Sequence, residues 1–191
     1  MTGYSQDDRN GAIVYGPVVT TFKIVGALVT ISILTISSQS ICAGSSIYVN
    51  FSTSGNFNQV SQFQVQLSDA NGPFQNPITI GTSNTTGTVS CFVPANIAEG
   101  TNYLIRVASS NQTAVGNPTM SAVTVNPLNS NILQNIPTGT ITNKATQTLS
   151  ATNKIIAPAN VSYQAGKAIS LNAGFEASNG SVFKAEIKGC N

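Results

Sequence analysis

Short runs of alternating apolar and polar residues occupy the first two thirds of the chain. They cover residues 47–51, 63–67, 78–80, 88–93, 103–107 and 120–125. Alternation with a period of two is typical of strands that bury one face, and no stretch has the 3.6-residue period of an amphipathic helix. Because turn residues separate the runs at roughly ten-residue intervals, the pattern predicts an immunoglobulin-like antiparallel β-sandwich over 24–127.

The longest apolar stretch, residues 24–36, has the sequence IVGALVTISILTI. It is shorter than the ~20 residues that a membrane-spanning helix needs, so we expect no membrane insertion. Its many β-branched residues favour a buried strand. The alternative is the apolar part of a signal peptide with a cleavage site at Ser38 and Ser40, but Asp7 and Asp8 are unusual in the segment that precedes one.

The run that begins at Tyr103 has two distinct faces. Tyr103, Ile105 and Val107 share one face, and Leu104 and Arg106 share the other. This arrangement is typical of the penultimate strand of an immunoglobulin-like sandwich, in which a corner tyrosine donates a hydrogen bond to the backbone upstream. We expect that structural role for Tyr103. The alternative is a platform on which a sugar ring stacks.

The three cysteines are too far apart in the sequence for a zinc knuckle or a C-x-x-C motif. If Cys42 opens the second strand and Cys91 closes the fifth, these strands are antiparallel neighbours and a Cys42–Cys91 disulfide can form. The alternative is that both are reduced apolar side chains. Cys190 would then be a free thiol or an intermolecular partner. Oxidised cysteines would indicate an extracytoplasmic compartment.

The pattern changes after a Pro- and Asn-rich segment, residues 128–137, which we interpret as a linker. Beyond it, residues of similar character recur 14 positions apart, as at Leu149, Tyr163 and Ala177. Units that repeat at a fixed period and cannot bury a face alone stack on one another. The sequence therefore predicts a small three-coil β-solenoid stack over 138–191.

Composition and charge exclude several classes of function. The chain has 8 Lys and Arg, 6 Asp and Glu, and no His. Without clustered positive charge, nucleic acid is not an expected partner, and without histidine the common triads and imidazole metal sites are excluded. Glu176 and Glu186 could be a glycosidase pair, but a thin stack offers no cleft, so we interpret them as surface charges. We expect no enzyme activity and neither metal nor cofactor.

Residues 1–23 precede the predicted sandwich and form a β-prone segment, which is apolar from Gly11 onward. We give the name assembly strand to the large apolar residues of this apolar part together with the next residue of that kind, Ile24. These residues are Ile13, Val14, Tyr15, Val18, Val19, Phe22 and Ile24. An unpaired strand of this kind is adhesive. One hypothesis is that it completes the sheet of a neighbouring copy, and such a head-to-tail contact propagates into a filament. The alternatives are an edge strand of its own domain or a remnant of a preceding repeat.

Parts of the sequence resemble known families. Residues 41–51 (ICAGSSIYVNF) and 103–110 (YLIRVASS) resemble the immunoglobulin-like domains of secreted surface proteins of Bacteroidetes-type bacteria. Residues 163–171 (YQAGKAISL) and 174–185 (GFEASNGSVFKA) resemble the three-coathanger stack domain at the ends of such proteins. The resemblance implies export to the cell surface or beyond, and it carries over no catalytic residue.

Together, the pattern and the resemblance predict a non-catalytic extracellular protein with a structural or adhesive role. We expect its partner to be another copy of itself, in a filament built through the assembly strand, or a neighbouring surface protein. The alternative is a carbohydrate-binding accessory module of an exported hydrolase, in which a glycan stacks on exposed tyrosines. The candidate tyrosines are Tyr48, Tyr103 and Tyr163.

Overall fold

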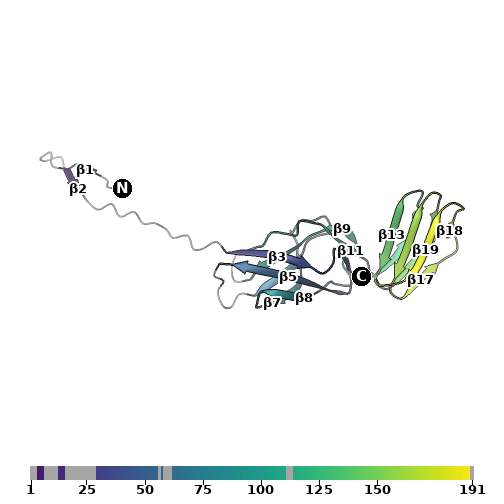
Figure 1. Ribbon diagram of the computed structural model, residues 1–191, viewed down its shortest axis with the longest axis horizontal. Helices are drawn as coiled ribbons and strands as arrows, with labels where there is room; N and C mark the ends of the chain where they lie inside the picture. Colours follow the sequence, from purple (N-terminus) through teal and green to yellow (C-terminus); the bar gives the residue numbers. More distant parts are fainter. Residues whose placement is uncertain are drawn as a thin grey trace.

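All regular elements of the described part of the chain are β-strands. The computed structural model describes residues 4–6, 13–15, 29–55, 57, 62–110 and 114–189. The predicted all-β fold class is therefore confirmed. Within these ranges no helix is long and apolar enough to cross a membrane. Besides the pair of short strands β1 (Tyr4–Gln6) and β2 (Ile13–Tyr15), Figure 1 shows two groups of strands, which we name the sandwich (β3 to β11) and the stack (β12 to β19).

The sandwich combines three sheets, ordered β3-β5-β8, β10-β6-β7 and β4-β11-β9. Its strands are β3 (Thr30–Ile36), β4 (Ser40–Cys42), β5 (Ser46–Ser54), β6 (Phe63–Leu67), β7 (Ile78–Ser83), β8 (Gly87–Phe92), β9 (Gly100–Tyr103), β10 (Ile105–Ser109) and β11 (Val123–Asn126). Pairing is antiparallel except between β4 and β11, which are parallel. Each run predicted from the alternating pattern overlaps one of these strands, and the run at 103–107 is divided between β9 and β10.

The alternation along β5 and β6 explains how the sandwich core forms. Ile47, Val49 and Phe51 on β5 are buried, as is every second residue of β6. These faces meet between the sheets, where the rings of Phe51 and Phe63 pack edge to face with centroids 5.1 Å apart. Such a pair contributes about 0.5–1.5 kcal/mol beyond the burial of its area. One continuous apolar cluster therefore holds the sheets together.

The stack consists of three layers of parallel strands. Its strands are β12 (Asn129–Ile132), β13 (Thr140–Ala145), β14 (Thr148–Ala151), β15 (Lys154–Ile155), β16 (Asn160–Ala165), β17 (Ala168–Leu171), β18 (Glu176–Ala177) and β19 (Val182–Ile187). They form sheets ordered β12-β14-β17, β13-β16-β19 and β15-β18. The first layer contributes β12 and β13, and the second and third layers each contribute one strand to all three sheets, around a second core separate from that of the sandwich.

The 14-residue repeat predicted from the sequence is wrong. Leu149 pairs with Ile169, 20 positions later, and Tyr163 pairs with Ala185, 22 positions later. Leu149, Tyr163 and Ala177, which the repeat treated as equivalent, lie in three different sheets. A spacing of 14 therefore connects different sides of the stack, because the chain must pass along three sides before it returns above its starting point.

The predicted linker, residues 128–137, is also corrected, because it belongs to the first layer of the stack. It contains β12, which pairs in parallel with β14, and Ile136 bridges Ile155. The side-chain oxygen of Asn129 accepts a hydrogen bond from the Thr148 hydroxyl, 2.7 Å away. Polar contacts of this kind between layers give the abundant Ser, Thr and Asn residues a structural role.

The first layer of the stack adjoins the sandwich. The Thr146 hydroxyl donates a hydrogen bond of 2.9 Å to the Ala43 carbonyl oxygen, and the Thr146 N–H donates one of 3.0 Å to the Pro127 carbonyl oxygen. In Figure 1, β13 lies on the side of the stack that faces the sandwich, and β18 lies on the far side. The third layer (β17, β18 and β19) therefore forms the outer end of the stack.

Candidate functional site

An open groove runs along β3, which is an edge strand of the β3-β5-β8 sheet. One wall is β3 itself, and the other is the non-strand segment 117–121. The volume of about 410 Å³ falls within the roughly 300–1,000 Å³ typical of binding sites. Half of its lining residues are apolar, namely Ile31, Ile33, Leu34, Ile36, Pro118 and Met120, and the other half are polar, namely Ser32, Thr35, Gln39, Asn117, Thr119 and Ser121.

Gly116 brings the two walls of the groove together at one end. A Cβ atom at this position would lie 2.7 Å from the Ile31 carbonyl oxygen, so only glycine allows this close approach. The Gly116 N–H donates to the Val107 carbonyl oxygen at 2.8 Å, and the Thr119 N–H donates to the Ile105 carbonyl oxygen at 2.8 Å. The second wall therefore follows β10 instead of pairing with β3, and a groove opens between them.

A β-bulge on β3 exposes an apolar side chain beside this groove. The pairing of β3 with β5 shifts register between Ile33 and Thr35, which leaves Leu34 without a cross-strand partner. Bulges on sheet edges commonly redirect a side chain. Leu34 is 59% exposed, and Met120 on the opposite wall is 105% exposed. Burial of both by a partner would be favourable, at about 25 cal/mol per Å² of apolar area.

Part of the predicted assembly strand lies in a separate sheet. β2 (Ile13–Tyr15) pairs antiparallel with β1 (Tyr4–Gln6), and this two-stranded sheet includes no strand of the sandwich. Residues 13–15 are therefore not an edge strand of their own sandwich sheets. A two-stranded hairpin alone is marginally stable in water. The remaining members of the assembly strand, Val18, Val19, Phe22 and Ile24, lie outside the described residues.

The predicted Cys42–Cys91 disulfide is wrong. Cys91 is a free thiol, and Cys42 is disulfide-bonded, so the alternative of two reduced side chains is wrong for Cys42 as well. The reason is that Cys42 belongs to β4, which pairs with β11, whereas Cys91 lies on β8, which pairs with β5. Cys91 is buried in the sandwich core. Cys190 lies outside the described residues.

The buried thiol leads to a labelling prediction. Burial raises the pKa of Cys91 to about 11. At pH 8 roughly one thiol in a thousand would then be the reactive thiolate. We expect iodoacetamide to leave Cys91 unmodified in the folded protein and to alkylate it fully in concentrated urea, as measured by peptide mass spectrometry. Rapid alkylation of the folded protein would contradict this placement.

Two of the three tyrosines proposed to stack on a glycan are buried, which corrects that prediction. Tyr103 is 2% exposed, and its hydroxyl donates to the Ala98 carbonyl oxygen at 2.8 Å, which confirms the expected corner role. Tyr163 is 0% exposed and donates to Asn153 Oδ1 at 2.8 Å. Of these three tyrosines, only Tyr48, which is 56% exposed, has a ring that a ligand can reach.

The corner hydrogen bond can be tested by removing one oxygen atom. We expect Tyr103→Phe to lower the free energy of unfolding by about 1 kcal/mol, because the Ala98 carbonyl loses its partner. The measurement is urea denaturation followed by circular dichroism. Tyr48→Phe is the matched control, since its exposed ring should leave the denaturation midpoint unchanged. Equal midpoints for the two variants would argue against a stabilising corner.

Sequence reasoning missed Phe92, the aromatic neighbour of Tyr48. On adjacent antiparallel strands Tyr48 pairs with Ser90, and Ser46 pairs with Phe92, so the two aromatic residues are diagonal neighbours on one face. Such positions are about 7–8 Å apart, within reach of aromatic side chains. Phe92 is 56% exposed. The alternating pattern of β8 indicates that Phe92 lies on the outer face, because the neighbouring residue Cys91 points inward.

The carboxylates of the stack pair with lysines on its surface. Glu176 Oε2 lies 2.9 Å from Lys154 Nζ, and Glu186 Oε1 lies 2.7 Å from Lys184 Nζ. The hydrogen bond from Lys184 lowers the pKa of Glu186. Within the described ranges, no group of three His, Cys, Asp or Glu side chains is arranged to hold a metal ion.

No protein-family model matches the chain, and no curated protein matches it significantly. Any assignment of function to this chain therefore depends on its structural features, chiefly the groove beside the edge strand β3.

Proposed function

We propose that this protein is a non-catalytic, exported structural subunit that forms filaments by donating its assembly strand to the groove of a neighbouring copy. The groove beside β3 is the observation that carries the proposal. It combines an edge strand with two exposed apolar side chains, Leu34 and Met120. A strand placed there would form backbone hydrogen bonds with β3 and insert alternate side chains into the groove.

The pattern of the donor segment suits this groove. In an extended strand, successive side chains point to opposite faces, so Val18, Phe22 and Ile24 would share one face with Thr20 between them. These side chains could fill the groove while the opposite face stays in contact with solvent. Because donor and acceptor are different surfaces, each added copy would leave one of each free, and the contact would propagate.

Export is supported by the oxidation state of Cys42. Disulfides persist in secreted and surface proteins and are rare in the cytosol, and Cys42 is disulfide-bonded. The scarcity of charged side chains also suits a packed polymer, because long ionic side chains cost free energy when they are desolvated at an interface. Both observations favour an extracellular structural role.

The groove can be tested with a matched pair of variants in the full chain. We expect Leu34→Asp to abolish filaments at concentrations where the parent chain forms them, because the docked strand would desolvate a charge in the groove. Leu133→Asp is the control, since Leu133 is 60% exposed and belongs to the stack. Negative-stain electron microscopy and sedimentation velocity give the result. Filaments that persist in the Leu34 variant would exclude this groove as the acceptor.

The aromatic pair on the sandwich supports a second candidate function. Tyr48 and Phe92 present two exposed rings on adjacent strands, an arrangement on which the apolar face of a sugar can stack. A carbohydrate-binding module would then bind through this face. Glycan-array binding that is lost in both Tyr48→Ala and Phe92→Ala would favour this function. No binding across a broad array would count against it.

A further inference from the structure

Among the described residues, no further strand pairs with the outer end of the stack, which therefore consists of strand edges. β17 and β19 are the edges of their three-stranded sheets, and β18 is the outer strand of its pair. Three large apolar side chains of this layer are exposed: Leu171 by 44%, Val182 by 57% and Ile187 by 62%. Unpaired edges with apolar side chains favour pairing with another chain. This end is separate from the groove beside β3 and takes no part in the proposed strand donation.

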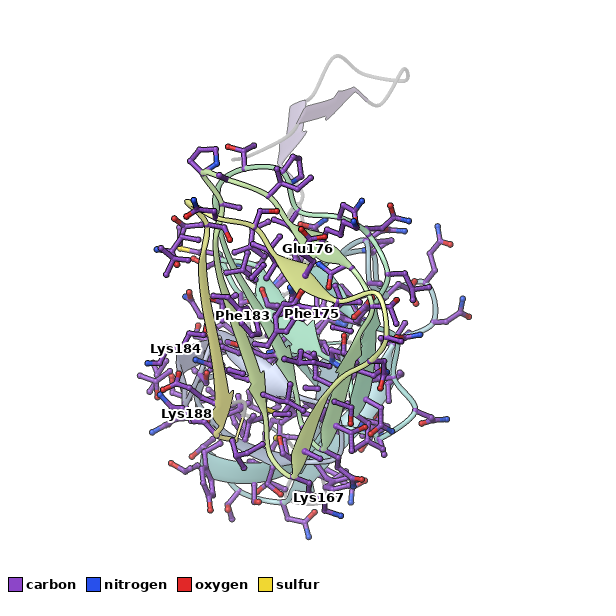
Figure 2. All side chains as sticks on the ribbon, turned by 90° about the vertical axis from the view of Figure 1, so that its right-hand side faces the viewer. Lys167, Phe175, Glu176, Phe183, Lys184 and Lys188 are labelled. Atoms are coloured by element: carbon purple, nitrogen blue, oxygen red, sulfur yellow. The ribbon has the colours of Figure 1, made fainter. Side chains whose placement is uncertain are left out.

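The core of the stack is incompletely covered at this end. Tyr163, in the layer below, is fully buried. Its ring centroid lies 5.2 Å from that of Phe183, and the ring centroids of Phe183 and Phe175 are 4.9 Å apart. Phe175 and Phe183 are only partly buried. Figure 2 looks onto this end and shows both rings near its centre, with Lys184 and Lys188 along the strand edge. A further layer of strands would complete the core.

We infer that this end binds the same end of a second copy, so that two molecules join through antiparallel pairing of their β19 strands. A twofold axis midway between Ala185 and Ala185 of the partner subunit would place Lys184 opposite Glu186 of the partner subunit, and Glu186 opposite Lys184 of the partner subunit. Phe183 would face Ile187 of the partner subunit on the core side. Opposite charges and apolar pairs directly across strands each stabilise a sheet.

Charge complementarity selects this register. Both β19 strands must turn Phe183, Ala185 and Ile187 toward the core, because these residues pair with buried positions of β16. Three registers keep these side chains on the core side and leave most of the strand paired. In them, the residue that faces its own copy across the twofold axis is 184, 185 or 186. A centre at Lys184 opposes two lysines, and a centre at Glu186 opposes two glutamates. Only the centre at Ala185 pairs opposite charges on both sides of the axis.

The remaining strands of the layer fit the same symmetry. β19, β17 and β18 belong to three different sheets, which form the sides of the stack. A twofold axis through the middle of the β19 side exchanges the other two sides of the stack. The β17 strand of each copy would therefore lie against β18 of its partner. Because the interface uses the same surface on both copies, it closes as a dimer and does not propagate.

A cysteine at the symmetry axis tests this contact directly in the full chain. We expect Ala185→Cys to form a reducible dimer under mild oxidation, at least about tenfold faster than Ala168→Cys. Ala168 is the matched control, because it is an exposed alanine on an edge strand of the same layer but would not face its own copy. Intact mass and non-reducing gels give the result. Equal rates for the two variants would overturn the inference.

Charge reversal then separates the contact between copies from the ion pair within β19. Lys184→Glu and Glu186→Lys should each weaken the dimer by at least about tenfold, since two attractive pairs become repulsive. An equimolar mixture of the two variants should restore dimers, because each Glu at 184 or 186 then faces a Lys of the partner. Sedimentation velocity of each variant and of the mixture measures this. Failure of the mixture to dimerise would overturn the inference, whereas filament formation through the β3 groove would be unaffected.

Discussion

Deletion of residues 1–23 is expected to give a folded protein that no longer forms filaments. All residues of the sandwich core lie between Ile31 and Val125, and those of the stack core lie between Ile136 and Ala165. The deletion therefore removes the assembly strand, except Ile24, and leaves both cores intact. Negative-stain electron microscopy and sedimentation velocity of both chains at matched concentrations would show the loss. Circular dichroism would show that the strand content of the sandwich and stack persists.

A synthetic peptide that covers residues 11–25 provides the complementary test. We expect it to bind the deleted chain through the vacant groove and to stop filament growth of the full chain when added in excess. The control is the same peptide with Phe22→Asp, which should do neither, because it would place a carboxylate in the groove. Filaments of the deleted chain itself would disprove strand donation by this segment.

Replacement of Gly166 is expected to give the second large effect, on the stability of the stack. A Cβ atom at this position would lie 2.1 Å from the Thr146 carbonyl oxygen, a backbone atom of the layer below. Layers at this corner must then move apart, although Thr146 is tied to the sandwich through its hydrogen bond to Ala43. We expect Gly166→Ala to lower the free energy of unfolding of the stack by about 3 kcal/mol.

Hydrogen exchange measured by mass spectrometry can locate that effect. Peptides from β14, β16 and β17 should exchange faster in the Gly166 variant, while peptides from β5 and β6 in the sandwich keep their protection. Gly189→Ala is the matched control, because a Cβ atom there would meet nothing within 4 Å. Unchanged protection of the stack in the Gly166 variant would show that the layers can separate at this corner at little cost.

Local pattern was enough to predict the strands of the sandwich except β4 (Ser40–Cys42), which none of the predicted runs covers. Alternation at 47–51 and 63–67 records which side chains face the core, because a strand turns every second residue the same way. The same rule identified the buried face of Tyr103, Ile105 and Val107. The corner role of Tyr103 is an expectation from the immunoglobulin-like sandwich, and the hydrogen bond to the Ala98 carbonyl oxygen confirms it. These features depend on residues close together in the sequence, where the geometry of an extended chain leaves few alternatives.

The stack was harder to predict because its equivalences are not local. Leu149 and Tyr163 resemble each other in character since both are buried, yet they lie on different sides of the same layer. The length of one circuit depends on the turns between strands, which vary, so partners are 20 positions apart on one side and 22 on another. A search for a single fixed period could not detect this.

The sequence by itself determined that the chain is all-β, which faces of its strands are buried, and that histidine-dependent chemistry is absent. Tertiary structure decided the rest. The pairing of β4 with β11 separates Cys42 from Cys91, the close approach at Gly116 opens the groove beside β3, and the third layer of the stack leaves β19 as an open edge. Alternation fixes only the direction of a side chain, whereas a groove or an edge depends on which distant strand lies alongside, and that choice is made when the sheets pack.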